Sequence, residues 1–188
     1  PAGLAAALAA GASGARVIVV DEQGEFGGAL LNDGGGPVAI GDGPPAAFVA
    51  AALEALRGMA EVTLLPRCTA FGYYADNFVT LLERLDEDGP PGGNRQRLWQ
   101  IRARQVVLAT GALERPLVFP DNDRPGIMLA GAAQSYVNRY GVQPGARCVV
   151  FTNNDSAYAA ALDMNRAGTA IEAIVDTRIE VEGEWPRL

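Results

Sequence analysis

The chain has 188 residues, 49% of them hydrophobic and 20% charged, which is enough to build the core of one domain or of two small ones. Its net charge of −7 argues against nucleic acid as a partner, because proteins that bind nucleic acid gather Lys and Arg on one face. No apolar run reaches the roughly 20 residues that cross a bilayer, so we expect a cytoplasmic protein with no membrane partner.

The first half of the chain alternates helical and extended patterns. Residues 3–12 are rich in Ala and Leu and predict a helix that ends at Gly14, and residues 16–20 predict a buried parallel strand. A Gly/Pro-rich loop over 33–45 leads to an expected helix at about 46–57. The apolar segments that follow predict a small meander and then a buried strand, at 62–65, 69–74, 78–85, 98–103 and 106–109.

The second half predicts a turn followed by a βαβ unit, the building block of a second parallel sheet. Its elements are expected at about 121–126, 130–140, 147–151, 155–167 and 171–175. The fold class is therefore α/β, with a Rossmann-like domain. We expect this domain at 1–120, with an inserted helix and meander at about 34–97, and a partial second Rossmann-like domain at 121–188.

Pro1-Ala2-Gly3 matches only the last half of a G-x-G-x-x-G fingerprint, so we expect a domain that lacks its first strand and is truncated at both ends. Gly3 would let the helix approach the strand, while the unpaired N–H groups of the helix start bind a pyrophosphate. Asp21 follows the first strand 18 residues later, where the fingerprint places an acid for the ribose hydroxyls. The alternative is an Asp that merely ends a strand.

A second fingerprint is expected after the strand at 147–151, but its three glycine positions carry Thr152, Asn154 and Ala157. Asn154 would crowd a pyrophosphate, and Asp155, the expected cap of the next helix, would repel it. We therefore expect this second site to be degenerate and empty of nucleotide.

Histidine is absent, and Cys68 and Cys148 form no C-x-x-C pair. We assign no catalytic residue and no metal ligand to this chain, and we interpret both cysteines as small hydrophobic side chains of the core.

Phe26-Gly27-Gly28 and the Ala109-Thr110-Gly111 turn resemble paired signatures of the flavoproteins with two dinucleotide-binding domains, the superfamily of glutathione reductase. In that superfamily the small residues of the second signature let the backbone approach the cofactor. The resemblance implies a Rossmann-like FAD/NAD(P)-binding fold of the glutathione-reductase kind. The residues after Gly28 lack the two cysteines of its disulfide reductases, which excludes disulfide reduction by this chain.

Longer strings resemble the alpha subunits of bacterial heterotetrameric sarcosine oxidases, and this resemblance covers essentially the whole chain. The strings are E-R-P at 114–116, N-D-R-P-G at 122–126 and V-V-F-T-N-N-D-S-A-Y at 149–158. The sequence departs from the family at 75–77, where Ala-Asp-Asn replaces Asp-His-Asn.

The resemblance implies an oxidoreductase that demethylates sarcosine to glycine, reduces O2 to H2O2 and can pass the one-carbon unit to tetrahydrofolate. It implies the other subunits of a heterotetramer as partners, with sarcosine and tetrahydrofolate bound elsewhere in the complex. It also implies NAD in the dinucleotide site of this chain, with FAD as the alternative. The residues that it assigns to the cofactor are Gly3, Asp21, Glu22, Gln23, Gly27, Gly28, Ala70, Thr110 and Gly111.

Two other functions remain open. The chain could belong to a related FAD-dependent amine or opine dehydrogenase, or to a non-catalytic subunit whose dinucleotide is structural.

Overall fold

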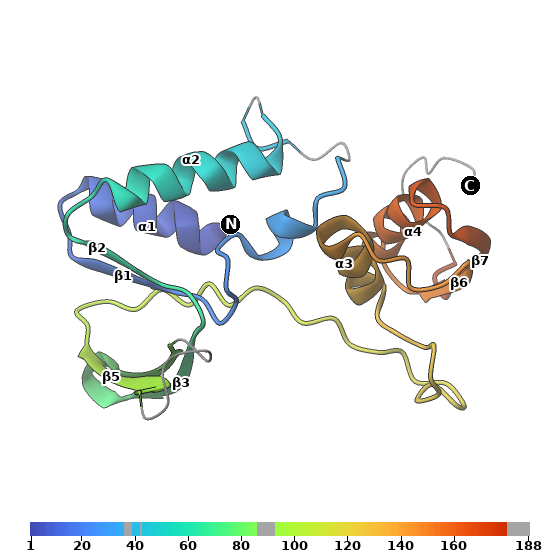
Figure 1. Cartoon of the computed structure of the whole chain (residues 1–188). Helices are drawn as coiled ribbons and strands as arrows, with labels where there is room; N and C mark the ends of the chain where they lie inside the picture. The colour runs from blue at the N-terminus through green and yellow to red at the C-terminus, as the bar shows by residue number, and fades with distance from the viewer. Residues whose placement is uncertain (36–38, 42, 86–92, 180–188) are drawn as a thin grey trace. The chain divides into compact units, whose positions relative to one another are not determined.

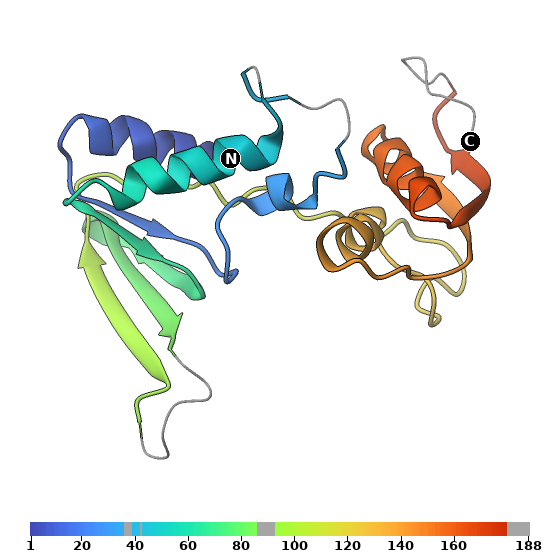
Figure 2. The same cartoon turned by 45° about the horizontal axis from the view of Figure 1, so that its top comes forward.

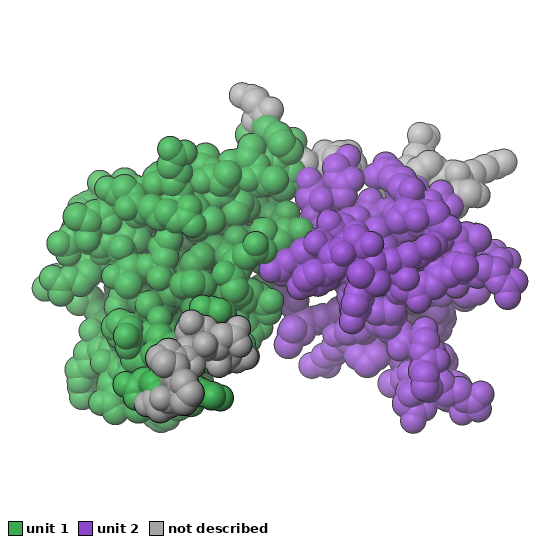
Figure 3. Space-filling model, viewed as in Figure 1, with its two compact units in different colours: residues 1–31, 39–111 green, residues 32–38, 112–188 purple. Residues whose placement is uncertain are grey.

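The computed structural model describes residues 1–35, 39–41, 43–85 and 93–179. The chain forms two compact units, residues 1–31 with 39–111 and residues 32–38 with 112–188 (Figure 3). Within the described residues, no helix is both long and apolar enough to span a membrane.

The first unit is built on two parallel strands, β1 (Val17–Val20) and β2 (Val62–Leu65), in which Val17 lies opposite Val62. Helices α1 (Ala2–Ala12) and α2 (Pro45–Arg57) lie side by side on one face of these strands (Figures 1 and 2). Gly14 takes a φ of +78° directly after α1, as the sequence predicts for a helix end. The core beneath the helices consists of Leu4, Ala7, Phe26, Val49, Ala52 and Leu56.

The other face of the parallel pair is covered by an antiparallel meander of β3 (Cys68–Tyr74), β4 (Phe78–Arg84) and β5 (Gln96–Arg102). Leu65 of β2 and Cys68 and Leu81 of the meander form a buried core between the two sheets, so Cys68 is a core side chain as predicted.

The assignment of residues 62–65 to the meander is wrong, because β2 pairs with β1 and not with β3. α2 connects β1 to β2, and a helical crossover returns the chain parallel to the strand it left. A short apolar run such as Val-Thr-Leu-Leu does not reveal which partner it will take.

The strand expected at 106–109 is also wrong. This segment forms no β-ladder with any described residue, and Val107 and Leu108 are 69% and 71% exposed. A parallel strand is stable only where a neighbouring strand satisfies its N–H and C=O groups, and the structure places no such neighbour along it among the described residues.

The second unit is a βαβ unit with one additional helix. β6 (Arg147–Thr152) and β7 (Ala170–Asp176) are parallel and are joined by α4 (Ser156–Arg166), against which α3 (Ala130–Tyr140) packs. Its core comprises Ala133, Val150, Ala157, Ala161 and Met164.

Candidate functional site

The start of α1 presents free backbone donors. The first hydrogen bond of the helix runs from the N–H of Ala5 to the carbonyl of Pro1, at 3.0 Å. No side chain caps this end, and no acidic residue lies in the first turn. The N–H groups ahead of Ala5 and the helix dipole therefore favour an anion at this end of α1.

Two other segments reach the same helix end. A β-carbon built on Gly3 would lie 3.4 Å from Cβ of Ala109, and one built on Gly28 would lie 3.7 Å from Cδ of Pro1. The structure thus brings the Phe26-Gly27-Gly28 segment and the Ala109-Thr110-Gly111 segment to the beginning of α1. The residues in contact there are small.

Gly27 is required by its backbone and by its surroundings. Its φ is +144°, and a β-carbon there would lie 2.8 Å from Cδ2 of Leu31. The preceding Phe26 is buried in the core with Leu4 and Val49. These contacts fix the double glycine beside the helix start.

Asp21 follows β1 directly and is partly buried. Its Oδ1 accepts a hydrogen bond from the N–H of Gln23 at 3.0 Å, whereas Oδ2 has no hydrogen-bond partner among the described residues. One carboxylate oxygen therefore stabilises the loop, and the other is available to a ligand hydroxyl.

The turn between β2 and β3 holds this acidic loop in place, which sequence reasoning missed. The N–H of Asp21 donates to Leu65 at 3.1 Å, and the carbonyls of Asp21 and Gln23 accept from Cys68 and Arg67, both at 2.8 Å. The Arg67 stem also passes Gly24, whose built β-carbon would lie 3.9 Å from it. No local sequence signal predicts contacts between segments more than 40 residues apart.

The remaining predicted cofactor residues are less directly placed. Glu22 is exposed, and Gln23 contributes the backbone donor to Asp21. Ala70 is exposed on β3 opposite Leu81, beside a bulge. Thr110 and Gly111 are exposed in irregular backbone, where Gly111 has a φ of +73°.

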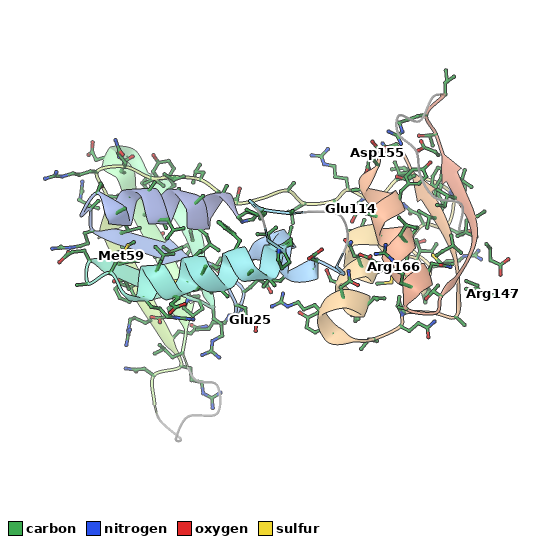
Figure 4. All side chains as sticks on the ribbon, turned by 90° about the horizontal axis from the view of Figure 1, so that it is seen from above. Glu25, Met59, Glu114, Arg147, Asp155 and Arg166 are labelled. Carbon is green, nitrogen blue, oxygen red and sulfur yellow. The ribbon has the colours of Figure 1, made fainter. Side chains whose placement is uncertain are left out.

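In the second unit, the loop between β6 and α4 forms hydrogen bonds with its own side chains at the position where a nucleotide would bind. Asp155 occupies the N-cap position of α4 as predicted but makes no side-chain cap bond, because its carboxylate accepts from Arg178 at 2.6 Å. The N–H of Ser156 instead donates to Oδ1 of Asn154 at 3.1 Å. Figure 4 shows Asp155 at the start of α4 and Arg166 towards its other end.

Arg178 also donates to both carboxylate oxygens of Asp176 at the end of β7, at 3.1 and 2.7 Å. These hydrogen bonds lower the pKa of Asp176 to about 2. Burial and the Asp176 carboxylate, to which its hydroxyl donates at 3.1 Å, raise the pKa of Tyr158. An internal charge network thus occupies the end of this sheet, where a Rossmann unit would hold the ribose.

The parallel pair, the uncapped helix end, the glycine junction and the acid after β1 define a dinucleotide-binding α/β protein. Residues 1–98 match the family model described as "FAD binding domain", which is more than half of the chain. The chain belongs to this FAD-binding family.

Similar proteins support the same assignment. The chain is 49% identical over 186 residues to the alpha subunit of sarcosine oxidase from Corynebacterium sp. (strain P-1), covering 96% of this chain and 19% of that protein. It is 31% identical over 185 residues to a subunit of opine oxidase from Agrobacterium tumefaciens (strain Ach5), covering 94% of this chain and 35% of that protein. The chain therefore spans about a fifth and about a third of the lengths of these two relatives.

Among solved structures, L-proline dehydrogenase from P. horikoshii matches with a TM-score of 0.75 and 25% identity, over 98% of this chain and 35% of that one. The Rossmann-like α/β class and the homology to sarcosine oxidase alpha subunits are thereby confirmed.

The expectation of NAD is wrong, because the matched family is an FAD-binding one and the match includes Gly3, Asp21, Gly27 and Gly28. NAD and FAD share the ADP half, and these residues are of the kind that recognises its pyrophosphate and ribose. They therefore predict a dinucleotide correctly but do not distinguish a nicotinamide from a flavin.

Proposed function

We propose that the first unit binds FAD through its ADP half. In this proposal the pyrophosphate lies at the uncapped start of α1, and Oδ2 of Asp21 accepts a hydrogen bond from a ribose hydroxyl. The observation that carries the proposal is the junction of Gly3, Gly28 and Ala109 at a helix end with free donors. Such an end favours an anion, and only small residues leave room for one.

The other assigned residues support this arrangement. Gly27 shapes the turn that leads into the pyrophosphate segment. Thr110 and Gly111 follow the Ala109 contact, and at Gly111 no side chain obstructs the approach of the cofactor to the backbone. Glu22, Gln23 and Ala70 line the ribose and adenine side, where the β2–β3 turn holds the acidic loop.

When bound, the flavin would supply the acceptor of electrons from the substrate. The residues of this chain orient and retain the cofactor. The N–H donors of α1 neutralise phosphate charge, Asp21 holds the ribose, and the glycines allow the cofactor to lie close to the backbone. All of them address the ADP half, so we assign no catalytic residue here.

At the level of the whole protein, we propose an oxidoreductase of the sarcosine oxidase type, in which this chain forms part of the alpha-type subunit. It would work with the other subunits of a heterotetramer, with sarcosine and tetrahydrofolate bound elsewhere in the complex. The complex would oxidise sarcosine to glycine, reduce O2 to H2O2 and pass the one-carbon unit to tetrahydrofolate. The 49% identity over 96% of the chain supports this assignment.

A second candidate is a subunit of an opine-oxidising enzyme, which the 31% identity to the opine oxidase relative supports. Both candidates oxidise a secondary amine, so the substrate separates them.

The test is to purify the protein with the subunits that accompany it and to measure H2O2 release with sarcosine and with an opine such as octopine. We expect sarcosine to give H2O2 in the presence of O2 and to reduce the flavin when O2 is removed. Turnover of the opine alone would favour the second candidate, and turnover of neither would contradict both.

A further inference from the structure

Arg67 is an exposed residue with an unfavourable backbone conformation. Its φ is +52°, in the left-handed region that glycine adopts freely and that other residues rarely adopt. Such a conformation persists only where the surrounding structure imposes it. Arg67 lies in the turn between β2 and β3 of the first unit, and the turn is flanked by Leu65 and Cys68, which are 5% and 1% exposed. Two buried side chains therefore fix the turn on either side of Arg67.

Both backbone polar groups of Arg67 are bonded to other segments of the first unit. Its N–H donates to the carbonyl of Gln23 at 2.8 Å, and its carbonyl accepts from the N–H of Arg84, the last residue of β4, at 2.9 Å. Arg67 thus joins the loop after β1 to the end of the meander. A rotation about φ of Arg67 would move its N–H and its carbonyl relative to each other, so it would break at least one of these bonds.

The loop that Arg67 holds is the one that carries Asp21. The N–H of Asp21 donates to Leu65 at 3.1 Å and its carbonyl accepts from Cys68 at 2.8 Å, so its backbone is paired with both residues that flank the turn. Its Oδ1 accepts from the N–H of Gln23 at 3.0 Å, and Gln23 is the residue to which Arg67 donates. The direction of Oδ2, the proposed ribose acceptor, therefore depends on the conformation of the turn.

The side chain of Arg67 makes no comparable contact. Among the described residues, the structure gives its guanidinium neither a hydrogen bond nor an ion pair. Its Cγ lies 3.9 Å from a β-carbon built on Gly24, which is an ordinary van der Waals distance. The backbone of Arg67, rather than its charge, is what connects the turn to the Asp21 loop.

We propose that Arg67 is a positioning residue of the flavin site, which acts through its left-handed backbone by holding Asp21 in place for the ribose of FAD. The turn bonds the Asp21 loop to the end of β4, so the acid is fixed relative to the meander as well as to β1. This inference rests on the proposed binding of FAD by the first unit.

The test uses two substitutions that both remove the guanidinium but differ in how well they tolerate a positive φ. Arg67→Gly adopts this conformation freely, whereas the β-branched side chain of Arg67→Val strongly disfavours it. The matched control pair is Asp76→Gly and Asp76→Val. Asp76 has a φ of +59° in the turn between β3 and β4, and it makes no backbone hydrogen bond to the Asp21 loop.

FAD affinity is measured by calorimetry on folded protein, with Asp21 present and in the Asp21→Ala background. We expect Arg67→Gly to bind FAD within twofold of the unmodified protein and Arg67→Val to bind it about tenfold more weakly. In the Asp21→Ala background, Arg67→Val should weaken binding by less than a further twofold, because both changes remove the same contact and their effects are not additive. Both Asp76 variants should bind FAD within twofold of the unmodified protein.

Equal affinities of Arg67→Gly and Arg67→Val would overturn the role of the backbone conformation. Additive effects of Arg67→Val and Asp21→Ala would also overturn the proposal, because Arg67 would then not act through Asp21. Failure of the unmodified protein to bind FAD would instead overturn the proposed function itself.

A milder pair of variants gives the same contrast if Arg67→Val does not fold. Asn adopts the left-handed region more readily than Ala, so Arg67→Asn should hold the Asp21 loop more firmly than Arg67→Ala. Hydrogen exchange of the Asp21 N–H should therefore be slower in Arg67→Asn. Equal exchange rates in these two variants would contradict the proposal.

Discussion

Gly3 and Ala109 are neighbours although 106 positions separate them, because a β-carbon built on Gly3 would lie 3.4 Å from Cβ of Ala109. This contact joins the free end of α1 to the segment that follows the meander, and it places the Ala-Thr-Gly turn beside the helix donors. The first unit is thereby a candidate binding site assembled from distant segments.

Gly3→Val should weaken FAD binding at least tenfold, because the added methyl groups would occupy the space that a pyrophosphate needs at the helix end. Because the methyl groups of Val extend beyond a β-carbon that already lies 3.4 Å from Cβ of Ala109, thermal unfolding of the variant checks that it remains folded. Isothermal titration with FAD measures the loss. The control is Ala9→Val, at an exposed position of the same helix, and equal affinities of the two variants would contradict the assignment.

Asp21→Ala should weaken FAD binding by about 1.5–3 kcal/mol, the scale of a hydrogen bond to a charged group. Asp21→Asn should cost less, because an amide oxygen can still accept from the N–H of Gln23. The control is Asp76→Asn, an exposed acid in the turn before β4. An unchanged affinity of Asp21→Ala for FAD in calorimetry would contradict the assignment of Asp21 to the ribose.

Gly27→Ala should destabilise the protein by about 2–4 kcal/mol, because strain at a φ of +144° adds to a clash with Leu31. Gly14→Ala is the matched control: it has a positive φ of +78°, but no atom lies within 4 Å of its built β-carbon. We expect it to cost only about 1 kcal/mol. Chemical denaturation should rank the two variants in this order, and the reverse order would show that the Leu31 contact has no effect.

The Asp176–Arg178 pair should make the stability of the second unit depend on pH. Arg178 holds the pKa of Asp176 at about 2, below its ordinary 3.8, so the stabilisation is complete above pH 3.8 and is lost as the pH falls towards 2. Thermal unfolding between pH 5 and about 2 measures this decline. Asp176→Asn should flatten the profile, whereas Asp123→Asn should leave it unchanged; identical slopes in all three proteins would contradict the pairing.

The sequence predicts local elements well where a residue determines the backbone by itself. Gly14 ends α1, and the apolar runs at 147–151 and 171–175 become β6 and β7. The prediction for residues 62–65 is wrong because β2 pairs with β1, a strand that is distant in the sequence. Asp155 occupies the predicted N-cap position of α4, but its carboxylate bonds to Arg178, 23 positions away, and does not cap the helix.

The candidate site is partly predictable for the same reason. Gly3, Asp21 and Gly27-Gly28 follow a spacing that reflects the shape of a dinucleotide. The sequence does not predict the role of Arg67, because its contact with the Asp21 loop depends on tertiary packing. The motif also cannot distinguish FAD from NAD, because its residues recognise only the ADP half that both molecules share.

The first unit should bind FAD, and the second unit should bind no nucleotide. The decisive experiment is titration of the purified, cofactor-depleted protein with FAD, followed by calorimetry and by mass analysis of the retained ligand. We expect one FAD per chain, lost in Gly3→Val and kept in Ala9→Val. No FAD binding would contradict the assignment of the site, and two FAD per chain would contradict the closed charge network of the second unit.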